Sequence, residues 1–142
     1  MGLNNMNALK INLTKNISDL TILVTKLEQF FQENNTPSIS MPMTLILEEL
    51  YTNTITHGAS DGRDVFIEIN LRIDRDELIM TYKDNGIPFN VLELPEPDLN
   101  ASIENREVGG LGVHYVKALT DSVEYEYVEK HNVLKMKKKL SG

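Results

Sequence analysis

The 142-residue sequence contains no cysteine and no long apolar run. Without cysteine, a disulfide scaffold, a thiolate zinc site, an iron–sulfur cluster and a thiol nucleophile are all excluded. No apolar stretch approaches the roughly 18 residues that a membrane-spanning helix requires. The N-terminus also lacks the basic segment followed by an apolar stretch that is typical of a secretory signal. We therefore expect a cytoplasmic protein.

Positive charge is in short supply. Lysine and arginine total 14 against 21 aspartates and glutamates, so the formal net charge is −7. This charge repels the phosphate backbone of nucleic acids and anionic lipids, so we expect neither as a partner.

A chain of this length buries roughly 68–70% of its unfolded surface as one domain, without a structural metal. We predict a single domain over residues 1–142.

Hydrophobic periodicity divides the chain into helices and strands. Alternation of apolar and polar residues predicts strands over 8–13, 65–72, 78–83, 122–128 and 133–140, with turns at 74–76 and 130–132. Helical spacing predicts helices over 20–31, 40–58 and 111–119. The strands do not alternate one for one with helices, which argues against a doubly wound parallel sheet. The order favours an α+β fold, a two-layer α/β sandwich in which helices cover one face of a mostly antiparallel, mixed sheet.

Residues 85–110 interrupt this periodicity. Pro88, Pro95 and Pro97 prevent a regular strand there, and the other residues are rich in glycine, asparagine and acidic side chains. A gap of this length inside a compact domain is more often a functional lid than a simple connector. We predict a lid at about 90–110.

The second predicted helix carries a first candidate cluster. Glu49 and Asn53 are four residues apart, on the border of the stripe expected to face the core. Asn53 can give an oxygen ligand to Mg²⁺, and Glu49 can accept a proton from a hydroxyl. A solvated glutamate beside a surface asparagine would have the same spacing, and taken alone the spacing favours that simpler interpretation.

A second cluster, Asp84-Asn85-Gly86-Ile87-Pro88-Phe89, directly follows a predicted strand. Asp84 can accept a hydrogen bond from an exocyclic amine, and Gly86 lets the backbone approach a flat ring. The same tripeptide Asp-Asn-Gly is also a good turn, which by itself is the simpler explanation.

A third cluster, Gly109-Gly110-Leu111-Gly112, precedes the last predicted helix. Glycines at the positive end of a helix expose amides that can hold phosphate. The segment is neither a dinucleotide fingerprint nor a Walker P-loop, because the third glycine and the Gly-Lys-Ser/Thr ending are missing.

The remaining polar side chains suggest no chemistry. His57, His114 and His131 have no spacing that indicates a metal site. The lysines between residues 135 and 139 are expected to lie on an exposed edge strand, where they would oppose aggregation.

Taken together and in this order, the three clusters resemble the N, G1 and G2 boxes of the ATPase fold shared by gyrase, histidine kinases and a mismatch-repair protein. Within that superfamily the chain is most similar to the small anti-sigma factor and serine-protein-kinase group, and the stretch 110–125 and Asn132-Val133-Leu134 share that similarity. The resemblance covers about 41–140. No phospho-accepting histidine helix precedes Glu49, so a complete sensor histidine kinase is excluded, and the G1-like segment lacks a second glycine.

The resemblance implies a site for ATP and Mg²⁺. Glu49 would be the catalytic base and Asn53 would hold Mg²⁺, while Asp84 would bind the adenine amine in a pocket shaped by Gly86. Gly110, Leu111 and Gly112 would form the phosphate-binding end of the lid. Arg106 is the only arginine or lysine between Asn85 and Gly110, so by charge and position we assign it to the γ-phosphate.

The resemblance further implies an ATP-dependent serine/threonine kinase. We expect it to phosphorylate a small partner protein, an anti-sigma antagonist, in a partner-switching circuit that controls a sigma factor. A first alternative is a non-catalytic, ATP-dependent binding module in which Glu49 only orders water. A second is a structural domain with three coincidental turns. The sequence leaves open whether the chain forms a homodimer.

Overall fold

The structure is a computed structural model that describes residues 7–59, 61–93 and 116–140. Its strands are β1 (Ala8–Thr14), β2 (Phe66–Asp74), β3 (Glu77–Asp84), β4 (Ser122–Val128) and β5 (His131–Lys139). They form one five-stranded sheet in the order β1-β2-β3-β5-β4. Every described pair of neighbouring strands is antiparallel. The sequence predicted a mostly antiparallel sheet, but the mixed pairing that it also predicted does not occur among the described strands.

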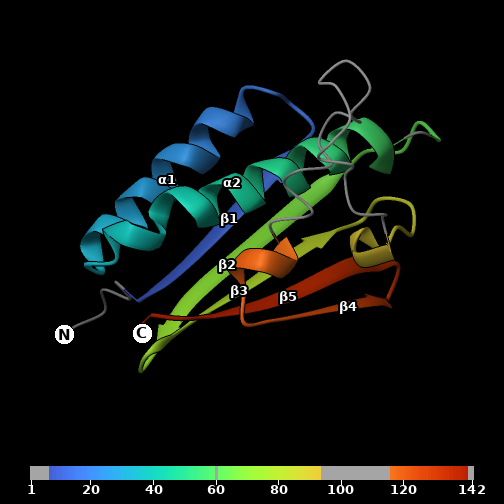
Figure 1. Ribbon diagram of the computed structural model, residues 1–142. Coiled ribbons are helices and arrows are strands. Elements are labelled where there is room, and N and C mark those ends of the chain that lie inside the picture. Colours follow the sequence, from blue (N-terminus) through green and yellow to red (C-terminus); the bar gives the residue numbers. More distant parts are fainter. Residues whose placement is uncertain (1–6, 60, 94–115, 141–142) are drawn as a thin grey trace, which may run out of the picture.

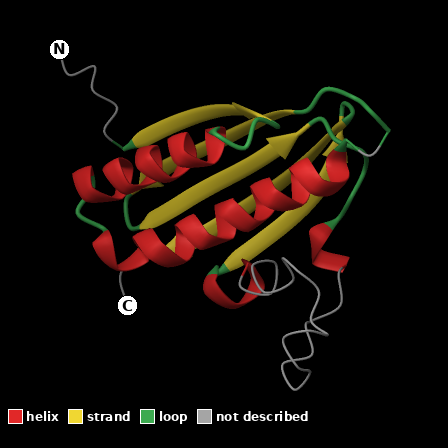
Figure 2. Cartoon of the chain, turned by 90° about the horizontal axis from the view of Figure 1, so that it is seen from above, coloured by secondary structure: helices red, strands yellow, loops and turns green. Residues whose placement is uncertain are grey.

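Two helices, α1 (Asp19–Glu33) and α2 (Pro37–Asn53), cover one face of this sheet (Figures 1 and 2). A π-helical turn, Thr54–Gly58, continues α2, and Val91–Glu93 forms a short 3₁₀ turn after β3. Residues 116–119 are helical. The predicted two-layer α+β sandwich is confirmed. No helix of the described residues is long and apolar enough to cross a membrane.

The core lies between the helices and the sheet, as the alternation predicts. Ile67, Ile69 and Leu71 of β2 are buried, and the intervening residues face away from the helices. The predicted stripe of the second helix is also buried, and it comprises Met43, Ile46, Leu47, Leu50 and Thr54. Burial of these alternating positions sets the register of the strands, because a slip of one residue would turn every apolar side chain outward.

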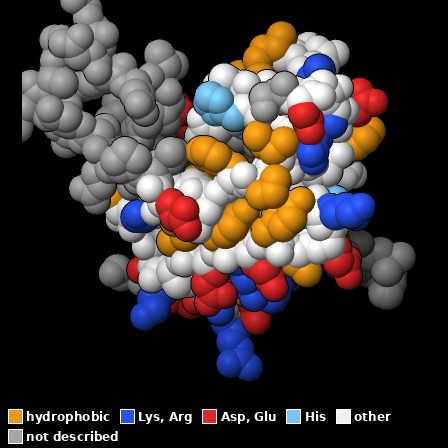
Figure 3. All heavy atoms as spheres, turned by 90° about the vertical axis from the view of Figure 1, so that its right-hand side faces the viewer, with side chains coloured by type: hydrophobic (Ala, Val, Ile, Leu, Met, Phe, Trp, Pro, Cys, Tyr) orange, Lys and Arg blue, Asp and Glu red, His pale blue; other side chains and the backbone are white. Residues whose placement is uncertain are grey.

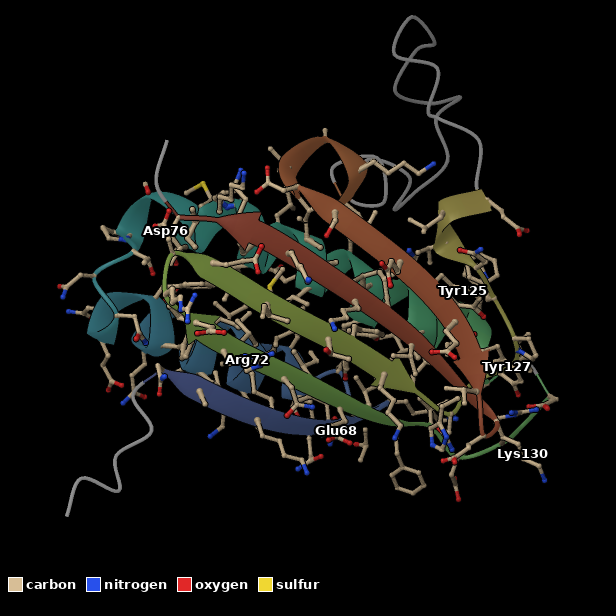
Figure 4. The ribbon with its side chains drawn as sticks, turned by 90° about the horizontal axis from the view of Figure 1, so that it is seen from below. Glu68, Arg72, Asp76, Tyr125, Tyr127 and Lys130 are labelled. Atoms are coloured by element: carbon tan, nitrogen blue, oxygen red, sulfur yellow. The ribbon has the colours of Figure 1, made fainter. Side chains whose placement is uncertain are left out.

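The other face of the sheet is polar and uncovered by helices. Figure 4 shows this face, with Glu68 and Arg72 projecting from β2. The Lys10 ammonium lies 3.3 Å from a Glu68 carboxylate oxygen across the β1–β2 pair. The face is therefore a solvated surface and the molecule has two layers.

Helix α2 begins three residues before the predicted start at Ser40. Pro37 occupies its first turn, where a missing N–H costs no hydrogen bond. Pro42 lies inside the helix and cannot donate to the carbonyl of Ser38. Ser38 is exposed, so its carbonyl can bond to water instead. Pro42 is therefore tolerated inside α2.

Two predictions about the last hairpin are wrong. The turn is Glu129-Lys130, both with positive φ (51° and 64°), and His131 and Asn132 already belong to β5. The lysine-rich strand is not an edge, because β5 lies between β3 and β4. Lys135, Lys137 and Lys139 alternate along β5 and point to the uncovered face of the sheet, while Leu134 and Met136 point to the core.

Candidate functional site

A pocket lies where the end of α2 passes over the end of β3 and the start of β5. It has about 440 Å³ of empty volume, including space open to solvent. Its lining is mostly apolar and comprises Leu50, Asn53, Thr54, His57, Gly58, Tyr82, Asp84, Ile87, Phe89, Val91, Tyr125, Asn132 and Leu134. Figure 3 looks at this end of the molecule and shows apolar side chains gathered between charged groups. An apolar pocket with a few polar groups is typical of a small-molecule site.

Asp84, the last residue of β3, is the buried carboxylate of this pocket, with only 7% of its surface exposed. Its Oδ1 accepts hydrogen bonds from the Gly86 amide at 2.8 Å and from Asn132 Nδ2 at 3.0 Å. Burial raises the pKa of Asp84, and these hydrogen bonds oppose part of that rise. Within residues 7–59, 61–93 and 116–140, the second oxygen, Oδ2, has only a long contact of 3.4 Å, from the Thr54 hydroxyl.

Thr54 connects α2 to the sheet below it. Its hydroxyl lies 2.7 Å from the Tyr82 hydroxyl, and each hydroxyl also reaches the Leu50 carbonyl, at 3.0 and 3.1 Å. These contacts hold the end of α2 against β3 beside Asp84. The sequence alone does not reveal this role, because Thr54 falls on the stripe that packs into the core.

Asn132 is a second polar side chain that the sequence did not assign to the site. Its Nδ2 donates to Asp84 Oδ1 and, at 2.9 Å, to the Ile87 carbonyl. Its Oδ1 accepts from the Phe89 amide at 2.9 Å and from the Tyr125 hydroxyl. Asn132 therefore ties Asp84 to the loop that follows it. The sequence did offer one indication of this role. Asn132 is a polar residue on the core-facing side of β5, where Leu134 and Met136 are apolar.

Gly86 packs against the backbone of Gly58. A Cβ on Gly86 would lie 2.9 Å from both Gly58 Cα and Asp84 Oδ1, closer than such atoms approach in proteins. The Ile87 amide also donates to the Gly58 carbonyl at 3.0 Å. The close approach in the structure is thus between two segments of the chain, whereas the sequence suggested an approach to a bound ring.

Glu49 and Asn53 occupy successive turns of α2, and only Asn53 lines the pocket. Glu49 Oε2 and Asn53 Nδ2 are buried without a hydrogen-bond partner among the described residues. Burial, and secondarily the charge of Glu48, raise the pKa of Glu49. The described residues satisfy neither atom, and of the two side chains Asn53 is the one placed to contact a ligand in the pocket.

In the part of the chain that the structure describes, no three acidic or histidine side chains gather into a metal site. Mg²⁺ does not require such a cluster, because it is commonly held by one or two protein oxygens together with substrate phosphates and water. The Asn53 carboxamide fits this kind of site, since its amide nitrogen has no described partner that would fix its orientation.

His57 and Phe89 form one wall of the pocket. Their rings are stacked with centroids 6.2 Å apart and an angle of 22° between the planes. His57 extends from the π-helical turn and Phe89 from the loop after β3, so the wall joins the two segments that also meet at Gly58 and Gly86.

The remaining predicted site residues, Arg106, Gly110, Leu111 and Gly112, lie outside the described residues. So does most of the predicted lid, of which the structure describes residues 90–93. Their roles stay predictions.

The profile of the histidine kinase-like ATPase domain matches residues 18–138. The chain belongs to this family. It is 32% identical over 96 residues to an anti-sigma F factor of Clostridium perfringens, covering 67% of this chain and 69% of that protein. It is 27% identical over 99 residues to the serine-protein kinase RsbW of Listeria monocytogenes, covering 67% and 63%.

Two solved structures support the fold. The histidine kinase AdeS of Acinetobacter baumannii matches with a TM-score of 0.52 and 14% identity, over 94% of this chain and 68% of that one. The catalytic domain of the histidine kinase ThkA matches with a TM-score of 0.52 and 12% identity, over 94% and 99%. At these identities the similarity concerns the fold alone.

Proposed function

We propose that this protein binds Mg²⁺–ATP in the pocket and transfers the γ-phosphoryl group to a serine or threonine of a small partner protein. The observation that carries the proposal is the Asp84 carboxylate, which is buried in an apolar pocket with one oxygen satisfied and the other weakly bonded. Membership of an ATPase family and the kinase names of relatives support it.

Asp84 suits adenine because Oδ2 can accept a hydrogen bond from the exocyclic amine. Guanine would place a carbonyl oxygen against the same carboxylate, which would leave two acceptors without a donor. The apolar lining and the stacked rings of His57 and Phe89 suit a flat heterocycle. We therefore expect ATP and ADP to bind and GTP to be rejected.

Asn53 and Glu49 are assigned to the phosphate end of the nucleotide. The Asn53 carboxamide oxygen would hold Mg²⁺, which neutralises charge on the β- and γ-phosphates when bound. We retain Gly110, Leu111, Gly112 and Arg106 as the residues proposed to contact phosphate.

Glu49 would act as the general base. The hydroxyl oxygen of the partner forms a bond to the γ-phosphorus, the bond to the β–γ bridging oxygen breaks, and ADP leaves. The hydroxyl proton passes to Glu49. A carboxylate with a raised pKa is better matched to this proton than an ordinary one, since the basicity of a general base rises with its pKa.

The partner is proposed from the relatives. The names anti-sigma F factor and serine-protein kinase RsbW support a small anti-sigma antagonist as the phosphate acceptor, and a sigma factor as the protein controlled. We place the protein in the cytoplasm and its function in the regulation of transcription on the same ground.

The test combines ATP binding with phosphate transfer. The acceptor is the small protein that co-purifies with this chain, and transfer is followed with radiolabelled ATP and phosphosite mapping. Glu49→Gln should change ATP affinity less than about 2-fold yet lower transfer by about 10²–10⁴-fold. Asn53→Ala should weaken Mg²⁺–ATP binding itself.

The alternative of a non-catalytic binding module makes the opposite prediction. In that case the wild type binds ATP but labels no acceptor, and Glu49→Gln releases the partner as the wild type does. Absence of ATP binding would reject both functions.

A further inference from the structure

The helical layer has a groove between α1 and α2, distinct from the nucleotide pocket. Figure 2 views the molecule from above, with both helices in front of the sheet. Val24, Glu28 and Gln32 line the groove from α1. The lining residues of α2 include Ser40, Met41, Thr44, Leu45 and Glu48. No strand residue lines it, so the groove opens on the face of the helices that the sheet does not cover.

The groove exposes apolar side chains that folding leaves in water. Met41 is 81% exposed and Leu45 is 37% exposed, and Val24 lies half-buried opposite them. Thr44, on the same wall, has a buried hydroxyl without a partner among the described residues. Methionine adapts its shape to different partners, so this surface is suited to covering by another apolar surface.

The charge of the groove restricts what can cover it. Glu28 and Glu48 line it from opposite helices, and among the residues that the structure describes no lysine, arginine or histidine does. This charge disfavours nucleic acid and anionic lipid. It also disfavours a second copy of the chain packed groove to groove, because a two-fold axis would bring the glutamates of both copies together.

We propose that this groove docks an amphipathic helix of a partner protein, with apolar side chains over Met41 and Leu45 and basic side chains against Glu28 and Glu48. The inference rests on the proposed function, for which it supplies a docking surface separate from the nucleotide pocket. An α-helix fits because two neighbouring helices offer a third one a matching groove, and apolar anchors at i, i+3, i+4 and i+7 would follow it.

A defined peptide tests this docking surface. The probe is a fluorescein-labelled, 18-residue helical peptide with leucines along one face and lysines elsewhere, and its control replaces the lysines by glutamates. The lysine peptide should bind the wild type and the glutamate peptide should not. Leu45→Glu and Glu28→Lys should each weaken binding of the lysine peptide at least about 10-fold.

Ile22→Glu is the matched control, because Ile22 is 45% exposed on α1 but does not line the groove. It adds the same charge as Leu45→Glu and should leave peptide binding unchanged. The cysteine-free chain permits a second readout: a photo-crosslinker on Met41→Cys should capture the peptide, and one on Ile22→Cys should not.

Equal binding by the wild type, Leu45→Glu and Ile22→Glu would overturn the proposal, as would no binding at all. So would sedimentation showing that Leu45→Glu separates a dimer into monomers, since the occupant would then be a second copy. ATP binding is measured on the same variants. If the wild type binds ATP but not the peptide, the docking proposal alone is rejected. If the wild type does not bind ATP, the proposed function is rejected.

Discussion

Asp84 combines a buried charge with an incomplete set of hydrogen bonds. A protein that needed this position only for stability would be served by a neutral side chain of the same shape, because burial raises the pKa of Asp84 and disfavours its charged form. Asparagine has that shape. Its carbonyl could accept from Gly86 and Asn132, and its amide could donate to the Thr54 hydroxyl.

Asp84→Asn should therefore separate folding from binding. At pH 7 the variant should be at least as stable as the wild type, but it should bind ATP about 10–100-fold more weakly because an amide donor would face the adenine amine. Urea unfolding and a thermal-shift titration with ATP measure the two effects. Asp74→Asn, at the far β2–β3 turn, is the control with the same change of charge.

The pH dependence of that stability difference has a defined sign. Because the pKa of Asp84 is raised on folding, the unfolded chain loses this proton first as the pH increases. Ionisation of Asp84 therefore lowers wild-type stability between its ordinary pKa and its raised pKa. The advantage of Asp84→Asn should be present at pH 7 and shrink as the pH falls through that range, and an advantage that grew on acidification would contradict this account.

Glu49 offers a prediction about activity and pH. The charge of Glu48 contributes to its raised pKa, so Glu48→Gln should lower the pKa of Glu49. A general base works deprotonated, and the acidic limb of the kcat profile should move to lower pH. The measurement is kcat against pH at saturating ATP and acceptor. Glu33→Gln, at the end of α1, should leave the midpoint unchanged.

At the scale of elements, the site depends on the contact between the π-helical turn and the loop after β3. Gly58 and Gly86 bring these two backbones together, and Asn132 holds the loop from β5. Three segments distant in sequence thereby determine where Asp84, His57 and Phe89 lie. The π-helical turn follows Asn53 directly, and such turns are frequent at functional sites.

The two glycines should differ in their tolerance of a methyl group. A Cβ on Gly86 meets the Gly58 backbone at 2.9 Å, whereas a Cβ on Gly58 meets a Thr54 methyl at 3.2 Å. Gly86→Ala should reduce the free energy of unfolding by about 1–3 kcal/mol and weaken ATP binding, with a smaller effect for Gly58→Ala. Urea unfolding measures the loss of stability in each variant. A larger loss for Gly58→Ala would show that the loop carrying Gly86 moves more easily than the Thr54 side chain.

At the scale of the whole molecule, buried tyrosines should limit stability in alkali. Burial raises the pKa of Tyr51, Tyr82 and Tyr125, with Tyr82 well above its ordinary value. Above about pH 10 the unfolded chain loses these protons while the folded chain keeps them, so the free energy of unfolding falls as the pH rises. For fully buried Tyr82 the slope is at most about 1.4 kcal/mol per pH unit.

Urea unfolding from pH 7 to pH 11 measures this decrease. In parallel, tyrosinate absorbance of the native protein should show part of the tyrosines ionising only when the protein unfolds. Tyrosines that all titrate normally before unfolding would contradict the burial seen at Tyr82.

The secondary structure was largely predictable from the sequence, because apolar periodicity reports which face of each element meets the core. The strands over 65–72 and 122–128 and the buried stripe of α2 are confirmed. The errors lie at ends and edges. They concern the start of α2, the last turn and the position of β5 in the sheet. These features depend on contacts with distant parts of the chain, about which local periodicity carries no information.

The site divides in the same way. In the sequence, Glu49, Asn53, Asp84 and Gly86 are predicted as site residues only through the combined resemblance of the three clusters to the N, G1 and G2 boxes, since each cluster alone has a simpler interpretation. Only the tertiary structure decided that Asn132 and Thr54 hold Asp84, that Gly58 meets Gly86, and that α1 and α2 leave an acidic groove. Asp84 and Asn132 are opposite each other because β3 pairs with β5 in one register. That register follows from burying one face of every strand at once, a property of the whole sheet that no single segment carries.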